Sequence, residues 1–104
     1  MNDLTPENNA RLQKLAPFAR RAGIAVTGRE KLAHIAGKLE FVIVTTDAAE
    51  NTADEISHAV HCPQLRILTS AELLALFGLQ NCCVAGFKKS SLATQLHNIL
   101  KNHE

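Results

Sequence analysis

The same four-residue pattern, a threonine followed three positions later by glutamate, occurs three times in this chain and limits its fold more than any other feature. The three copies are Thr27–Glu30, Thr52–Glu55 and Thr69–Glu72, and apolar residues at helical spacing follow each one. In such a pair the hydroxyl and the carboxylate bond the free backbone N–H groups at the start of a helix. The pattern therefore predicts three helix starts.

Two further helices are predicted outside these copies. Pro6, after Thr5, marks a helix start, because proline is well tolerated at the first helical position. Pro17 lies inside this helix and is expected to kink it. A last helix is predicted from about Ser90 to Asn102. Three glycines are expected to end helices: Gly23, Gly37 and Gly78.

Short β-prone runs lie between the helices, at residues 24–26, 41–46, 66–68 and 82–85. The second run is continuously apolar over four residues, which is typical of an interior strand covered on both faces. Strict alternation of helix and strand predicts an α/β fold, a three-layer α/β/α sandwich with helices on both sides of the sheet. The length of 104 residues and the hydrophobic fraction of 46% fit a single domain, residues 1–104.

Several classes of protein are disfavoured by what the sequence lacks. No apolar run approaches the ~20 residues of a membrane span, and we expect neither a signal peptide nor a membrane partner. The odd count of three cysteines, two of them adjacent, does not fit a disulfide framework and favours a cytoplasmic location. Phosphate-cradling glycine motifs and the Gly-x-Ser-x-Gly of hydrolases are absent. We therefore expect no enzyme activity and no cofactor.

The formal net charge of +1 conceals a strong segregation of charge along the chain. Residues 1–38 hold seven lysines and arginines against three acids, whereas residues 39–80 hold one arginine against six acids. Such blocks can form opposite faces of a folded domain, and a basic face suits an anionic partner. An unevenly composed solvated surface fits the same counts.

Three groups of chemically active side chains have plainer interpretations. His58, His61 and Cys62 have the spacing of a partial metal site, but a fourth ligand is not evident, so we predict no metal. The adjacent Cys82 and Cys83 are interpreted as small buried residues of a strand rather than nucleophiles. Two interpretations of Asp47 stay open: a binding group at the end of a strand, and a residue that shapes the turn. His97 and His103 are not assigned to a site.

Two predicted helix starts combine free N–H groups with neighbouring cations, a combination that suits phosphate oxygens. One spans residues 27–31 and the other spans residues 84–90. Phe87 is predicted to offer a platform for an unstacked base. Gly28 and Gly86 are predicted to allow a close approach of an RNA backbone.

Five ordered blocks of the sequence carry a resemblance to a known superfamily: residues 18–23, 26–30, 41–52, 68–73 and 77–78. They resemble the superfamily of ribosomal proteins L-seven-Ae and L-thirty-e, which bind kink-turn RNA. The likeness is strongest to the small bacterial branch encoded among transcription and translation factor genes. The resemblance implies an α/β/α sandwich with a mixed four-stranded sheet. It also implies a structured RNA partner, of kink-turn or ribosomal type, with which the protein would form a ribonucleoprotein, and association with the ribosome or translation factors.

The resemblance implies RNA binding through two loops, residues 28–34 and 84–89, and Lys88 and Lys89 are expected to contact phosphates. The residues concerned are Gly28, Arg29, Glu30, Lys31, His34, Val84, Ala85, Gly86, Phe87, Lys88 and Lys89. Relatives carry Gly-x-Asn-Glu-x-x-Lys at the second helix start, and Glu30 replaces the asparagine here. Since a carboxylate cannot supply the donor of an amide, the sequence favours contacts to the RNA backbone. The alternative hypothesis is a protein-interaction module that docks through acidic residues 47–55.

Overall fold

A computed structural model describes residues 6–79 and 83–101 of the chain. Helices and strands alternate along it as the sequence predicted. The helices are α1 (Pro6–Arg21), α2 (Arg29–His34), α3 (Glu50–Ala59), α4 (Ser70–Phe77) and α5 (Ser91–Leu100). The strands are β1 (Ala25–Thr27), β2 (Leu39–Val44), β3 (Gln64–Leu65) and β4 (Val84–Lys88), and a short 3-10 turn, η1 (Ala36–Lys38), precedes β2.

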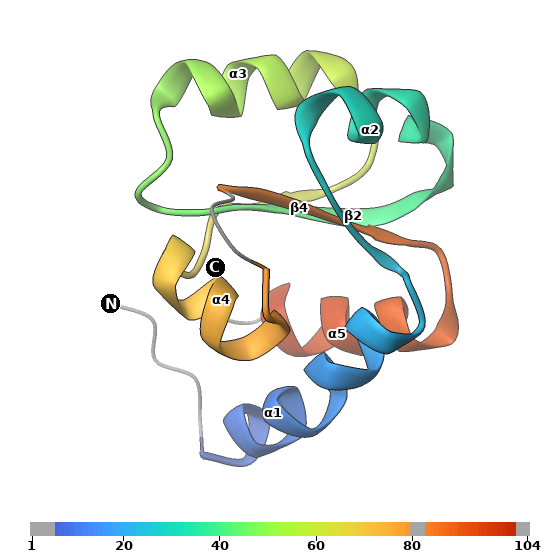
Figure 1. Ribbon diagram of the computed structural model, residues 1–104, viewed down its shortest axis with the longest axis vertical. Helices are drawn as coiled ribbons and strands as arrows, with labels where there is room; N and C mark the ends of the chain where they lie inside the picture. The colour runs from blue at the N-terminus through green and yellow to red at the C-terminus, as the bar shows by residue number, and fades with distance from the viewer. Residues whose placement is uncertain (1–5, 80–82, 102–104) are drawn as a thin grey trace.

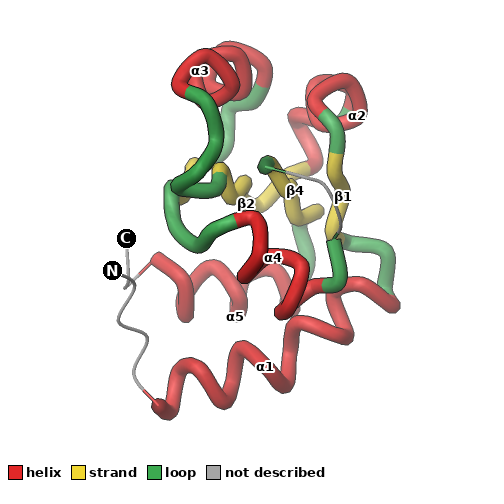
Figure 2. Tube along the Cα trace, turned by 60° about the vertical axis from the view of Figure 1, so that its left-hand side comes forward, coloured by secondary structure: helices red, strands yellow, loops and turns green. Residues whose placement is uncertain are grey.

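The four strands form one mixed sheet in the order β1-β4-β2-β3. Strand β4 runs antiparallel to both of its neighbours, and β2 and β3 run parallel. Helices α2 and α3 cover one face, while α1, α4 and α5 cover the other, as two views of the chain show (Figures 1 and 2). The predicted α/β sandwich is therefore confirmed.

Strand β2 supplies side chains to two separate cores, one on each face of the sheet. Phe41 and Ile43 pack with α1, α4 and α5, whereas Val42 and Val44 pack beneath α2 and α3. Successive side chains of a strand point to opposite faces, so a continuously apolar run is what a doubly covered strand requires. The prediction of an interior strand from this run is confirmed.

Of the three predicted capping motifs, one forms. Thr69 accepts from the backbone N–H of Glu72, and the Glu72 carboxylate accepts from the Thr69 N–H, at 3.2 and 2.8 Å. Thr52 lies inside α3, which begins earlier, at Glu50, and Thr27 ends strand β1. The prediction that Thr27 and Thr52 cap helices was wrong. Thr27 is paired within the sheet, and α3 begins two residues before Thr52.

The other boundary predictions had mixed outcomes. Gly23 and Gly78, with φ of 70° and 69°, follow α1 and end α4, and the Ser90 hydroxyl caps α5. Helix α2 ends at His34, and Gly37 lies in η1, so Gly37 does not end that helix. The strand predicted at 66–68 forms earlier, as β3, and the one predicted at 82–85 begins at Val84. The described helices include none long and apolar enough to cross a membrane.

Candidate nucleic-acid interface

The start of α2 is an open backbone position. Gly28 precedes the helix with a φ of 95°, a conformation that L side chains rarely adopt, and it is exposed. No heavy atom lies within 4 Å of the place where a Cβ at this position would be. The close approach predicted for a ligand backbone is therefore sterically open at Gly28.

One side of α2 faces solvent while the other is packed on the sheet. Gly28, Lys31 and His34 follow at intervals of three, and residues so spaced lie along the same side of a helix. All three are exposed, whereas Leu32 is fully buried against the sheet. Glu30 is exposed as well, and the Arg29 side chain lies outside the described part of the structure.

Basic side chains from two distant segments line one pocket. Lys31 and His34 of α2 and Lys88 at the end of β4 surround a hollow of about 390 Å³. All three residues of β1 also line it, and β1 is an edge strand of the sheet. The structure therefore brings the predicted segments together through Lys88.

The basic surface continues beyond this pocket. Lys89 follows Lys88, and its backbone N–H donates to the carbonyl of Lys38 at 2.8 Å. Lys38 and Lys89 are both exposed. Lys38 is the last residue of η1 and lies far from Lys89 in the sequence. Only the hydrogen bond between their backbones brings the two lysines together, so the sequence did not indicate Lys38. We call the group Lys31, His34, Lys38, Lys88 and Lys89 the basic edge.

The second predicted segment is not a loop. Val84, Ala85, Gly86 and Phe87 belong to β4, which pairs with β1 on one side and β2 on the other. The Phe87 ring is fully buried and stacks on Phe41, with ring centroids 4.6 Å apart. Phe87 therefore cannot serve as a platform for a base, and Val84 and Ala85 are buried with it.

Gly86 also has a different role from the one predicted. A Cβ at this position would overlap the side chain of Leu32, which packs on β4 from α2. The missing side chain lets α2 approach the sheet closely, so the space at Gly86 is filled by protein.

The two helix starts that the sequence grouped together lie at opposite ends of β4. Antiparallel pairing sets Thr27 beside Ala85 and Ala25 beside Phe87. The start of α2 therefore adjoins the beginning of β4, whereas the start of α5, which follows Lys89, adjoins its end. Lys88 meets Lys31 and His34 because α2 runs back along β1.

Asp47 stabilises the junction between β2 and α4. Its carboxylate accepts from the backbone N–H of Ser70 at 3.2 Å and from the Ser70 hydroxyl at 2.7 Å. The nearby hydroxyls of Thr45 and Ser70 lower the pKa of Asp47 below its ordinary value. The buried Thr45 hydroxyl forms no hydrogen bond of ordinary geometry, so it acts on the carboxylate as a neighbouring dipole. These contacts favour the turn-shaping interpretation of Asp47.

The histidines and cysteines are dispersed. The Nδ1–H of His58 donates to the Asp54 carbonyl at 2.7 Å. Burial, with a smaller contribution from Glu40, raises the pKa of the half-buried Cys62 thiol. Within residues 6–79 and 83–101, no three His, Cys, Asp or Glu side chains come together as metal ligands.

The two adjacent cysteines were placed in a strand by the sequence. Cys83 is instead exposed and precedes β4, so the prediction that it is buried in a strand was wrong. Cys82 lies outside the described residues.

Comparisons with known proteins identify the fold. Many solved structures are similar to it, and two of them match over most of both chains. A protein of unknown function from Bacillus halodurans C matches with a TM-score of 0.71 and 21% identity, over 88% of this chain and 98% of its own. The 15.5kD RNA binding protein of Giardia lamblia matches with a TM-score of 0.66 and 18% identity, over 95% of this chain and 89% of its own. No family profile matches the chain, and no curated protein matches it.

Proposed function

We propose that this protein is a non-enzymatic RNA-binding protein of the L-seven-Ae and L-thirty-e type, which binds structured RNA of kink-turn-like or ribosomal kind through α2 and the basic edge. The observation that carries the proposal is the convergence of Lys31, His34 and Lys88 on one pocket beside β1. The fold is shared with an RNA-binding protein, which supports the same assignment.

The geometry favours contacts to phosphates over contacts to base edges. Gly28 offers an unobstructed backbone, and α2, with six residues, is about 9 Å long. One RNA strand can therefore lie along the exposed side of α2 from Gly28 to His34 and continue to Lys88. Lysines supply charge to phosphate oxygens without reading sequence, whereas Glu30 cannot donate to a base. Arg29 and Lys89 are proposed as further phosphate ligands.

The proposal is tested with a labelled kink-turn RNA and a control RNA whose sheared G·A pairs are disrupted. Binding should weaken as salt rises, because cations on the RNA are released when lysines neutralise phosphates. The variant Lys31→Glu/Lys88→Glu should bind more weakly, and the slope of log K against log salt should fall by about 0.7–0.9 for each lost contact. Fluorescence anisotropy measures both quantities.

Lys101→Glu provides a control of the same kind of charge change at an exposed position after α5. It should leave the salt slope unchanged. Equal affinity for the two RNAs would remove the kink-turn specificity and leave only binding to the RNA backbone. Absence of binding to either RNA at low salt, or an equal loss in Lys101→Glu, would refute the proposal.

The acidic segment 47–55 as a docking face stays a prediction without an observation in its favour. The Asp47 carboxylate at its start already bonds Ser70. Glu50 and Asp54 are exposed on α3.

A further inference from the structure

The outer side of α1 carries three cations and one aromatic ring. Arg11, Lys14, Phe18 and Arg21 are all exposed, and intervals of three and four residues place them along one stripe of the helix. The opposite side of α1 is buried in the core through Leu12, Ala16 and Ala19. Helix α1, which carries this stripe, lies across the sheet from α2 (Figure 1).

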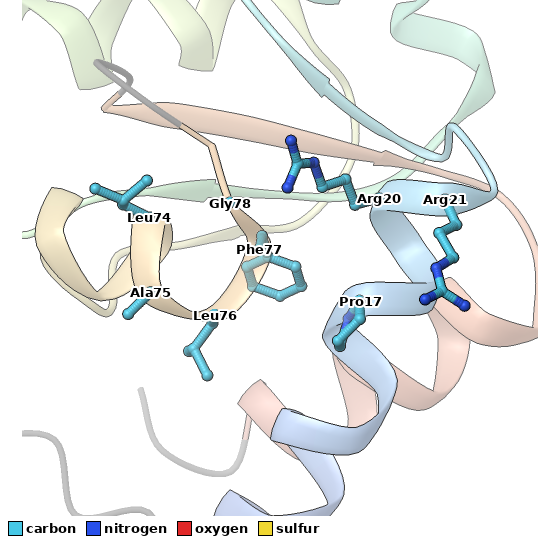
Figure 3. A pocket seen from close by; sticks show the side chains of 8 residues that line it. All are labelled: Pro17, Arg20, Arg21, Leu74, Ala75, Leu76, Phe77 and Gly78. Carbon is cyan, nitrogen blue, oxygen red and sulfur yellow. The ribbon is translucent and has the colours of Figure 1, made fainter.

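A groove of about 490 Å³ runs between the last turns of α1 and α4. Its walls are Pro17, Arg20 and Arg21 on α1 and residues 74–78 at the end of α4. Figure 3 shows that the Arg20 side chain extends toward Gly78, whereas the Arg21 side chain turns back toward Pro17. A Cβ at Gly78 would lie 2.5 Å from an Arg20 guanidinium nitrogen, so that glycine leaves room for the arginine.

The groove combines exposed apolar surface with unpaired positive charge. Phe18 is 50% exposed and Leu74 is 43% exposed, and these are the large hydrophobic side chains that the described part of the chain leaves open to solvent. Leu74 and the half-buried Leu76 line the groove, whereas Phe18 is not among the residues that line it. Among the described residues, neither Arg20 nor Arg21 has an ion-pair partner. Apolar side chains that stay open to solvent in a groove beside positive charge are typical of an interaction surface.

We propose that this α1–α4 groove docks a segment of a partner protein in which acidic side chains flank one apolar anchor. The apolar walls, Leu74, Leu76 and Phe77, accept the anchor, and Arg20 and Arg21 pair with carboxylates. Arginine and aromatic side chains around a concave site are the usual centres of binding energy in protein interfaces.

Charge and apolar surface together favour this occupant over two others. The phosphates of an RNA strand could pair with the arginines, but they would make no apolar contact with the leucines of α4. A second copy of this chain offers acidic side chains on α3, but α3 exposes no large hydrophobic side chain to act as the anchor. The partner segment must supply both features.

The test uses a fluorescein-labelled peptide, Glu-Asp-Glu-Leu-Phe-Glu-Asp-Glu, and the full chain. The variants Leu74→Ser and Arg21→Glu change exposed side chains that line the groove and should fold normally, as circular dichroism can verify. Each should lower peptide affinity about tenfold or more, because one variant removes an apolar contact with the anchor and the other removes an ion pair with a carboxylate. Lys88→Glu makes the same charge change on the basic edge and should leave peptide binding unchanged.

Four results would overturn the proposal. The first is no binding of the peptide up to millimolar concentration, and the second is equal binding of a peptide with serines in place of Leu-Phe. The third is tighter binding of an eight-nucleotide RNA that is lost in Leu74→Ser and Arg21→Glu. The fourth is self-association in sedimentation experiments that the same variants abolish. Because the RNA test rests on Lys31 and Lys88, either proposal can fail without the other.

Discussion

Helix α2 and strand β4 touch each other through Leu32 and Gly86, but they meet the solvent in different ways. The helix buries one side and leaves Lys31 and His34 exposed on the other. The strand lies between two other strands and under helices on both faces, so only its last residue, Lys88, is exposed. A binding surface can therefore use a whole side of α2 but only the end of β4.

The largest expected effect concerns the buried aromatic of β4. Phe87→Ala should lower the free energy of unfolding by about 3–5 kcal/mol, because it opens a cavity between Phe41 and Phe77. His34→Ala, on the exposed side of α2, should change it by about 0.5 kcal/mol or less. Urea unfolding measures both. A stable Phe87→Ala protein that had lost only RNA binding would show that Phe87 acts at the surface.

Replacing Gly86 or Gly28 by alanine should lower the free energy of unfolding, but for different physical reasons. Gly86→Ala overpacks the contact with Leu32 and should cost about 1–3 kcal/mol. Gly28→Ala meets no neighbour, but its positive φ should cost about 1–2 kcal/mol.

A double-mutant cycle separates the two causes. Adding Leu32→Ala should relieve the steric cost of Gly86→Ala, whereas its effect should simply add to that of Gly28→Ala. Additivity in both pairs would contradict the close packing of α2 on β4.

Replacing the threonine near the start of α4 should lower stability more than replacing the one near the start of α2. Thr69→Ala removes a complete capping box and should cost about 1 kcal/mol of unfolding free energy. Thr27→Ala, at the β1–α2 junction, should cost about 0.5 kcal/mol or less, because Thr27 makes no cap. Equal losses in thermal or urea unfolding would mean that Thr27 caps α2 in solution.

The smallest effect is expected at Asp47 and depends on pH. Its pKa is lowered in the folded protein, so its stabilising contribution is complete above the ordinary carboxyl pKa and is lost as the pH falls through the lowered value. Asp47→Asn should therefore be less stable than the native chain at pH 7, and the difference should shrink from about pH 5 toward pH 2. A difference independent of pH would exclude the ionised carboxylate as its cause.

Local patterns were sufficient for the order of helices and strands and for the doubly covered strand β2. They were insufficient at helix starts, where Thr27 and Thr69 carry the same pattern but only Thr69 caps a helix. Strand pairing at Thr27 overrides the local preference. For the candidate site, the exposure of Lys31 and His34 follows from helical spacing, whereas the burial of Phe87 depends on which strands adjoin β4.

The sequence by itself determined the alternation of elements, the two-sided core and the basic character of the segment around α2, because each follows from spacing and composition within a short window. Only the tertiary structure decided that β4 lies between β1 and β2, that Lys88 meets α2, and that α1 and α4 form a groove. These features depend on contacts between residues far apart in the chain, and no local pattern specifies which strand lies beside which.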